Sequence, residues 1–223
     1  MKNIPLRDRL VYHLGDGALE KLLKCHATGL LLDIGCGKKP YAAMTRNLVT
    51  RHVGVDHPDT PHGRGGMDAA AAAYALPFRD ATFDGVLCTS VLEHLEEPEA
   101  ALREAFRVLK PGGKAFYMTP FLWHVHEEPR DFYRYSRYGL EYLFTKAGFE
   151  NTEVVPLSGF WVTFGQLFVY QMYRLHRGPL RWFPVIPVAG ALVQLLAYGL
   201  EKLDRAPGSR KWTWAYLTLA RKP

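Results

Sequence analysis

The chain is poor in cysteine and has no stretch that suggests export. Its three cysteines stand far apart among 223 residues, and none forms a Cys-x-x-Cys pair. This scarcity argues against a disulfide framework and against a cysteine zinc site. The first ten residues, MKNIPLRDRL, lack the apolar centre of a signal peptide. We therefore expect reduced thiols and a cytoplasmic location.

Acidic residues are scarce in the last third of the chain. Residues 151–223 contain nine Lys or Arg and three Asp or Glu, in a protein of formal net charge +6. This imbalance favours an anionic partner, membrane headgroups first and nucleic acid second. The alternative is an ordinary basic tail on a cytoplasmic enzyme. Hydrophobic residues make up 48% of the whole, which excludes wholesale disorder.

The most informative stretch is residues 30–41, LLLDIGCGKKPY. Its first five residues predict a strand that is apolar on both faces, as at the centre of a parallel sheet. Gly35 and Gly37 then permit a sharp turn and a close approach of a ligand to the backbone. A strand, a glycine turn and a helix start are typical of a nucleotide-type binding site. A third glycine, which a dinucleotide dehydrogenase normally carries, is missing.

A second strand is predicted over residues 52–59, HVGVDHPD, and it ends on an acid. Asp56 follows Gly35 by 21 residues, which is the position from which an acid holds the hydroxyls of a ribose. The alternative is a cap of a turn or helix. Strands over 83–90 and 114–119 alternate with helices over 40–49 and 101–113, after an amphipathic helix over 6–26. This alternation predicts an α/β fold with a parallel, doubly wound sheet.

Residues 30–120 resemble a class I S-adenosylmethionine-dependent methyltransferase of the type-11 methyltransferase family. The resemblance depends on an ordered series of motifs: LLLDIGCG, VGVD, LPFRDATFDGVLCTSVLEHLEEP, ALREAFRVLKPGG and KAFYMTP. It implies a Rossmann-like, seven-stranded, mostly parallel sheet. It also implies S-adenosylmethionine as the cofactor and S-adenosylhomocysteine as the product.

The resemblance assigns the cofactor to residues that follow the strands. Asp33, Gly35, Cys36 and Gly37 would surround its methionine part. Asp56 would hold the ribose, with His57 beside the adenine. Further predicted cofactor contacts are Thr89 and Ser90 near the sulfonium, and backbone groups around Ala72 and Ala73 at the adenine.

Ala72 departs from the family pattern. Relatives usually carry an acid at this position, four residues before Leu-Pro-Phe, where it meets the adenine amino group. Asp68 lies too far along the chain to replace it. Losing one charge-assisted hydrogen bond weakens cofactor binding by about 1–3 kcal/mol.

Candidates for catalysis follow the strand over 114–119, in WHVHEEPRDFYRYS (123–136). His126 is the first candidate for a proton acceptor and His124 the second, with Asp131 and Tyr133 nearby. The alternative is a lid whose charges pair with one another. No metal site is predicted, because His124-x-His126-Glu127-Glu128 lacks a third group of ligands. Glu93 and His94 are interpreted as helix-start residues beside the cofactor.

Residues 158–212 form an apolar, aromatic insertion between two expected core segments. The predicted domains are a methyltransferase core, 1–157 and 213–223 with an N-terminal helix in 1–28, and this helical insertion. Two uncharged runs and the boundary aromatics Trp161 and Trp182 suit a membrane surface. A soluble lid or homodimer face and a spanning hairpin are the alternatives.

Together these features predict methyl transfer to a small-molecule, glycan or lipid-linked acceptor, with oxygen as the receiving atom. The location is then cytoplasmic, with contact to the membrane periphery through residues 158–212 as an extension. One alternative is a methyltransferase-fold partner or regulator with weak or no catalysis. The other is an RNA methyltransferase, which is disfavoured because no basic and aromatic RNA platform is visible.

Overall fold

The computed structural model describes residues 4–178, 184–204, 206 and 208–223. These residues cluster into two compact units. The first, which we call the core unit, comprises Glu20–Pro120, His124–Val155 and Tyr216–Pro223. The second, which we call the helical unit, comprises Met1–Leu19, Phe121–Trp123 and Pro156–Ala215.

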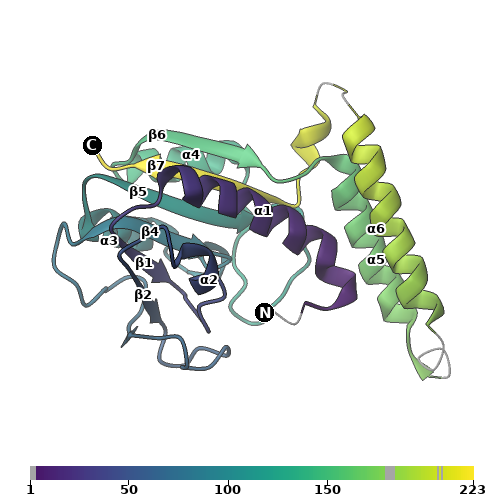
Figure 1. Ribbon diagram of the computed structural model, residues 1–223, viewed down its shortest axis with the longest axis horizontal. Helices are drawn as coiled ribbons and strands as arrows, with labels where there is room; N and C mark the ends of the chain where they lie inside the picture. Colours follow the sequence, from purple (N-terminus) through teal and green to yellow (C-terminus); the bar gives the residue numbers. More distant parts are fainter. Residues whose placement is uncertain (1–3, 179–183, 205, 207) are drawn as a thin grey trace. The chain divides into compact units, whose positions relative to one another are not determined.

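A seven-stranded sheet forms the centre of the fold, in the order β3-β2-β1-β4-β5-β7-β6 (Figure 1). Neighbours among β1 to β5 pair in parallel. This arrangement confirms the predicted Rossmann-like sheet. Its strands are β1 (Leu30–Ile34), β2 (Arg51–Asp56), β3 (Ala69–Ala70), β4 (Phe83–Thr89), β5 (Leu109–Pro120), β6 (Glu150–Pro156) and β7 (Ala215–Arg221).

The sheet is central because its inner strands are apolar on both faces. In β1, Leu31 and Leu32 are fully buried, and Ile34 is 3% exposed. The neighbouring β4 buries Val86 and Leu87 completely. Such double-sided burial is what a parallel strand covered by helices requires.

Helices of the core unit join its strands and flank the sheet (Figure 1). The predicted helix over 40–49 is shorter than expected, at four residues, because 46–50 forms turns. The predicted helix over 101–113 ends at Val108, where β5 begins. The helical elements of the chain are η1 (Leu6–Asp8), α1 (Arg9–His26), α2 (Ala42–Thr45), η2 (Leu92–His94), α3 (Pro98–Val108), α4 (Arg137–Lys146), α5 (Phe160–Leu175), α6 (Val185–Leu203) and η4 (Ser209–Trp212).

The register of the sheet brings three strand ends to one edge. Ile34, the last residue of β1, pairs with Val55 of β2 and with Cys88 of β4. The residues that follow these strands, including Gly35, therefore lie along the same carboxyl edge. In open α/β sheets this edge is where ligands bind.

In the helical unit, α5 and α6 pack side by side as an antiparallel pair (Figure 1). Small residues allow the close approach: a Cβ on Gly165 would lie 2.6 Å from that of Ala197. The predicted helical character of residues 158–212 agrees with these two helices. Trp182, expected as a boundary aromatic, lies outside the described residues.

Amide side chains attach the N-terminal segment to this helix pair. The Arg7 carbonyl accepts hydrogen bonds from Gln166 Nε2 at 2.8 Å and from Gln194 Nε2 at 2.5 Å. Tyr170 donates its hydroxyl to Asp8 at 2.8 Å. Among the described residues, 4–19 group with the helical unit, whereas 1–28 was expected to belong to the core. The functional domain boundaries at 157 and 213 remain a prediction.

An acidic side chain ties together the starts of β1, β4 and β5. Asp84 accepts a hydrogen bond from the Leu30 N–H at 2.7 Å and pairs with Lys110 Nζ at 2.8 Å. Burial alone would raise the pKa of Asp84, but the Leu30 N–H and Lys110 lower it overall. A carboxyl whose pKa is lowered by folding stabilises the fold above its ordinary pKa of 3.8 and loses that effect in acid.

We expect Asp84→Ala to lower the free energy of unfolding by about 1–3 kcal/mol at neutral pH, because the Leu30 N–H loses its acceptor. Urea denaturation at several pH values measures this. Asp84→Asn is the control, since its amide oxygen still accepts from Leu30 and only the ion pair is lost. The difference from the wild type should shrink below about pH 4. An equal loss at neutral and acid pH would contradict the assignment.

Candidate active site at the carboxyl edge of the sheet

The glycine turn after β1 has the backbone geometry that the sequence predicts. Gly35 and Gly37 have φ values of +70° and +49°, which favour glycine. The Gly35 N–H and the Cys36 N–H both donate to the Val55 carbonyl, at 2.8 and 3.1 Å. Burial raises the pKa of Cys36 to about 12, so the thiol is neutral and this residue contributes through its backbone.

Gly35 is also required by the neighbouring segment. A Cβ at this position would overlap the Cγ2 methyl of Val91, which lies between β4 and η2. Any side chain here would push the two segments apart. The glycine turn and the start of η2 are therefore held in direct contact.

Asp33, predicted to act on the methionine part of the cofactor, is 2% exposed and bonded within the chain. Its Oδ2 lies 2.9 Å from Nε2 of His52, and Nδ1 of His52 lies 2.8 Å from the Thr45 hydroxyl. Burial raises the pKa of Asp33, while His52 opposes the rise. Asp33 thus takes part in a buried series of hydrogen bonds with His52 and Thr45, just before the glycine turn.

Asp56 links the end of β2 to the glycine turn. Its Oδ2 accepts the Gly37 N–H and its Oδ1 accepts the His57 N–H, both at 2.7 Å. His57 is only partly buried, and its Nδ1 accepts the Asp59 N–H at 3.1 Å. The predicted ribose acid and the predicted turn therefore form one connected structure.

Asp68 does not stand in for the missing adenine acid. Its carboxylate accepts the Gly54 N–H at 2.7 Å and pairs with Lys39. Lys39 and the Gly54 N–H lower the pKa of Asp68. With this carboxylate bonded within the chain, an adenine contact around Ala72 and Ala73 stays a prediction.

Thr89 and Ser90 end β4 at the same edge. Ser90 is exposed and has a φ of +52°, and its N–H donates to the Met118 carbonyl at 2.8 Å. Thr89 is partly buried. The structure therefore brings both residues to the edge that the glycine turn and Asp56 share, as expected.

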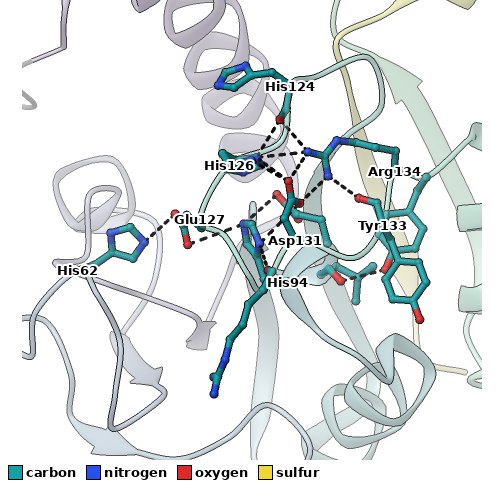
Figure 2. A network of polar contacts seen from close by, with 12 residues as sticks. His62, His94, His124, His126, Glu127, Asp131, Tyr133 and Arg134 are labelled. Carbon is teal, nitrogen blue, oxygen red and sulfur yellow. Dashed lines mark hydrogen bonds and ion pairs between the residues drawn. The ribbon is translucent and has the colours of Figure 1, made fainter.

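The segment after β5 is organised by an arginine clamp (Figure 2). Two nitrogens of Arg134 each donate to one oxygen of Asp131 at 2.6 Å. Asp131 Oδ2 also accepts the His126 N–H at 2.8 Å. Arg134 holds the pKa of Asp131 well below its usual range, and burial lowers the pKa of His126. Asp131 is thus an ionised brace that positions His126.

His124 and Tyr133 lie beside this clamp but play different parts. The His124 carbonyl accepts a hydrogen bond from Arg134 at 2.8 Å, and His124 itself is an exposed residue. Tyr133 donates its hydroxyl to the Glu96 carbonyl at 2.9 Å, and its N–H donates to the Glu93 carbonyl at 3.2 Å. Of the four predicted catalytic residues, His126 and Asp131 are the pair that the clamp holds together.

Two residues of η2 join His126 and were not among the predicted catalytic residues. Glu93 is fully buried, and burial raises its pKa to about 8. His94 packs edge to face against His126, with ring centroids 4.8 Å apart. In the sequence, the only sign of their role is that Glu93 and His94 are adjacent and follow a predicted strand. Only the fold brings it against a loop that lies more than 30 residues later.

Glu127 connects this group to the loop after β2. Its Oε1 lies 3.1 Å from Nε2 of His62, and its Oε2 lies 3.9 Å from Nε2 of His94 (Figure 2). His62 in turn faces the glycine turn, since a Cβ on Gly37 would lie 3.4 Å from that of His62. The glycine turn and the histidine cluster are therefore two parts of one site.

Comparison with known proteins agrees with this geometry. Residues 32–117 match the family model described as a methyltransferase domain. The chain is 26% identical over 124 residues to the ubiquinone biosynthesis O-methyltransferase of Pseudomonas fluorescens (strain SBW25), and the match covers 51% of each protein. The chain thus spans about half the length of the curated relatives it matches.

Solved structures share the fold across nearly the whole chain. The [4+2]-cyclase SpnF has a TM-score of 0.63 at 22% identity, over 92% of this chain and 81% of that one. Phosphoethanolamine N-methyltransferase 2 of Haemonchus contortus, bound to S-adenosyl-L-methionine, has a TM-score of 0.59 at 20% identity. Here 94% of this chain and 52% of that chain are covered.

These findings confirm the predicted resemblance to methyltransferases and the fold class. The resemblance implies S-adenosylmethionine as the cofactor. The residues present fit that cofactor. Gly35 and Gly37 offer a backbone without side chains, and Asp56 stands at the β2 end. Because a cyclase shares the same fold, the acceptor must be argued from the site itself.

We expect Asp56→Ala to weaken S-adenosylmethionine binding roughly 10- to 100-fold, because the carboxylate predicted to accept the ribose hydroxyls is lost. Isothermal titration calorimetry with S-adenosylmethionine and S-adenosylhomocysteine measures the change. Asp80→Ala is the matched control, since that carboxylate is 76% exposed and pairs with Arg107 instead. Unchanged affinity in Asp56→Ala would remove the ribose role.

Proposed function

We propose that this chain is an S-adenosylmethionine-dependent methyltransferase that methylates a hydroxyl oxygen of a small-molecule, glycan or lipid-linked acceptor. The observation that carries the proposal is the group Glu93, His94 and His126 beside the glycine turn. A carboxylate and two imidazoles can accept the proton that a hydroxyl must lose. The match to a relative named an O-methyltransferase supports oxygen as the receiving atom.

The chemistry asks little of the protein beyond position and proton removal. S-adenosylmethionine supplies a methyl group that is already electrophilic. The acceptor oxygen bonds to the methyl carbon while the carbon–sulfur bond breaks, and the electron pair stays on sulfur. The hydroxyl proton leaves through the histidine cluster to solvent. Holding the two reactants in line supplies most of the acceleration.

A groove in the core unit suits an aromatic acceptor. It is open, has a volume of about 500 Å³, and is lined by Tyr133, Tyr135 and Leu143 together with the charged residues Glu97, Glu99 and Arg103. The two tyrosine rings are 5.7 Å apart. Aromatic walls of this kind bind flat rings through their faces and edges.

We expect His126→Ala to reduce methyl transfer roughly 100- to 10,000-fold while S-adenosylmethionine binding stays intact, because a proton-accepting group is removed. Transfer of a labelled methyl group to phenols, quinols, sugars and amines measures this. Glu128→Gln is the matched control, an exposed carboxylate two residues away. Transfer only to amines would refute the oxygen proposal, and cofactor binding without any turnover would favour the regulatory alternative. Methylation of RNA in the same assay would favour the remaining alternative.

A lipid-linked acceptor is supported by the surface of the helical unit. Val185–Leu203 is long and apolar enough to cross a membrane, with a mean hydropathy of 1.3, and 17% of it is buried. Its exposed residues include Leu192, Leu195 and Leu196. On α5, Phe164 and Phe168 are also exposed. Apolar side chains on one helix pair, with basic residues nearby, suit contact with an anionic membrane surface.

We expect the protein to sediment with vesicles rich in anionic lipid. The double variant Leu192→Asp/Leu196→Asp should weaken this binding by at least about tenfold, because two exposed apolar contacts are lost. Tyr142→Asp is the matched control, since Tyr142 is 63% exposed on α4 of the core unit. A protein that stays in the supernatant would refute membrane contact and leave a soluble lid or dimer face.

A further inference from the structure

Three side chains of the core unit converge on one point beside the glycine turn. Glu93 and His94 from η2, and His126 from the segment after β5, each offer a ligand atom. These atoms all lie within 4.8 Å of one another. The histidines approach from separate segments, as Figure 2 shows for His94 and His126.

The hydrogen bonds fix which nitrogen of His94 faces this point. Nδ1 lies 2.6 Å from the Arg130 carbonyl, and since a carbonyl only accepts, Nδ1 must carry the hydrogen. In a neutral imidazole the lone pair is then on Nε2. Nε2 is buried and has no hydrogen-bond partner among the described residues. It lies 3.8 Å from Glu93 Oε1 and 3.9 Å from Glu127 Oε2.

The cluster is therefore made of acceptors that face one another. Both oxygens of Glu93 are buried, and no other described residue donates a hydrogen bond to either. Buried polar atoms without partners are rare in folded proteins, so each one needs an explanation. A positive species between these atoms would satisfy all of them at once.

Once Glu93 has released its proton to make way for an ion, the net charge around this point is negative. Asp131 and Arg134 form a bidentate pair and largely offset each other. Glu93 and Glu127 remain, and only Glu127 has a histidine, His62, at 3.1 Å. Two carboxylates and two imidazoles match the charge and the ligand preference of a divalent transition metal.

We propose that Glu93, His94 and His126, with Glu127 as a fourth ligand, bind a divalent first-row transition-metal ion such as Mn²⁺, Fe²⁺ or Zn²⁺. Ligands about 2.1 Å from one ion lie at most about 4.2 Å apart. A pair at the 4.8 Å limit must therefore close by at least about 0.6 Å when the ion binds. The Arg130 carbonyl orients the His94 ring through Nδ1, as outer partners of metal ligands do. Asp131 holds the backbone N–H of His126, and its Oδ2 lies 3.3 Å from Nδ1 of that ring.

The metal site extends the proposed function, and the role of the ion in catalysis rests on that function. A metal that takes the acceptor hydroxyl as a further ligand lowers the pKa of that hydroxyl, so the oxygen attacks the methyl group at neutral pH. With the ion bound, His126 is a ligand, and the proton of the hydroxyl passes to solvent water instead of to the histidine cluster. The sequence indicated no metal because the ligands in residues 124–128 lacked a third group. The fold supplies that group from η2.

The test is binding of Mn²⁺ to protein that has first been stripped with a chelator. We expect one Mn²⁺ per chain by calorimetry and by electron paramagnetic resonance, and ligand-field absorption bands on addition of Co²⁺. Glu93→Gln and His126→Asn should each weaken Mn²⁺ binding by about 100-fold. Because Glu93 is buried and its variant can fail to fold, His126→Asn, in the segment after β5, is the second variant. Glu128→Gln is the matched control and should bind like the wild type.

Two results would overturn the metal site. One is the lack of stoichiometric binding of Mn²⁺, Co²⁺ and Zn²⁺, and the other is binding that neither variant weakens. These outcomes are separable from the proposed function. Methyl transfer to a hydroxyl that persists in chelator, without metal binding, leaves the function and removes the metal. Metal binding that both variants abolish, without any hydroxyl methylation, leaves the site and removes the function.

Discussion

The contact between Gly35 and Val91 is the constraint on which the site depends. Because no Cβ stands at Gly35, the turn after β1 lies directly against the segment between β4 and η2. The next residues of that segment are those of η2, including Glu93 and His94. A glycine that opens the cofactor site therefore also sets how near the histidine cluster comes to it. The two halves of the site cannot move apart without losing this packing.

Much of the cofactor side was predictable because its signals are local. A strand, two glycines and an acid at a fixed distance are read within 27 residues, from Leu30 to Asp56. Parallel pairing of β1 and β2 then brings these residues to one edge. The absence of an adenine-binding acid at Ala72 could also be predicted, because it concerns a single position in the series of family motifs. Geometry added the hydrogen bond between Gly37 and Asp56, which no spacing reveals.

The acceptor side was not predictable to the same degree because it depends on contacts between distant residues. His94 and His126 are 32 positions apart, and the direction of the His94 lone pair follows from a carbonyl at Arg130. The N-terminal segment presents the same difficulty. Its place with the helical unit depends on amides of Gln166 and Gln194 that reach the Arg7 carbonyl. A periodic pattern in the sequence carries none of this information.

Two buried carboxylates in the core unit separate a structural role from a functional one. Burial raises the pKa of both Asp33 and Glu93. Asp33 has its partner within the chain, since His52 Nε2 lies 2.9 Å away and the Thr45 hydroxyl supports that ring. Glu93 receives no hydrogen bond from another described residue, although a histidine ring is close by. That ring turns its lone pair toward the carboxylate and its hydrogen toward a carbonyl. Asp33 is thus satisfied by its neighbours in the chain, whereas the oxygens of Glu93 can still accept a ligand from outside. That difference is expected between a structural acid and an active-site acid.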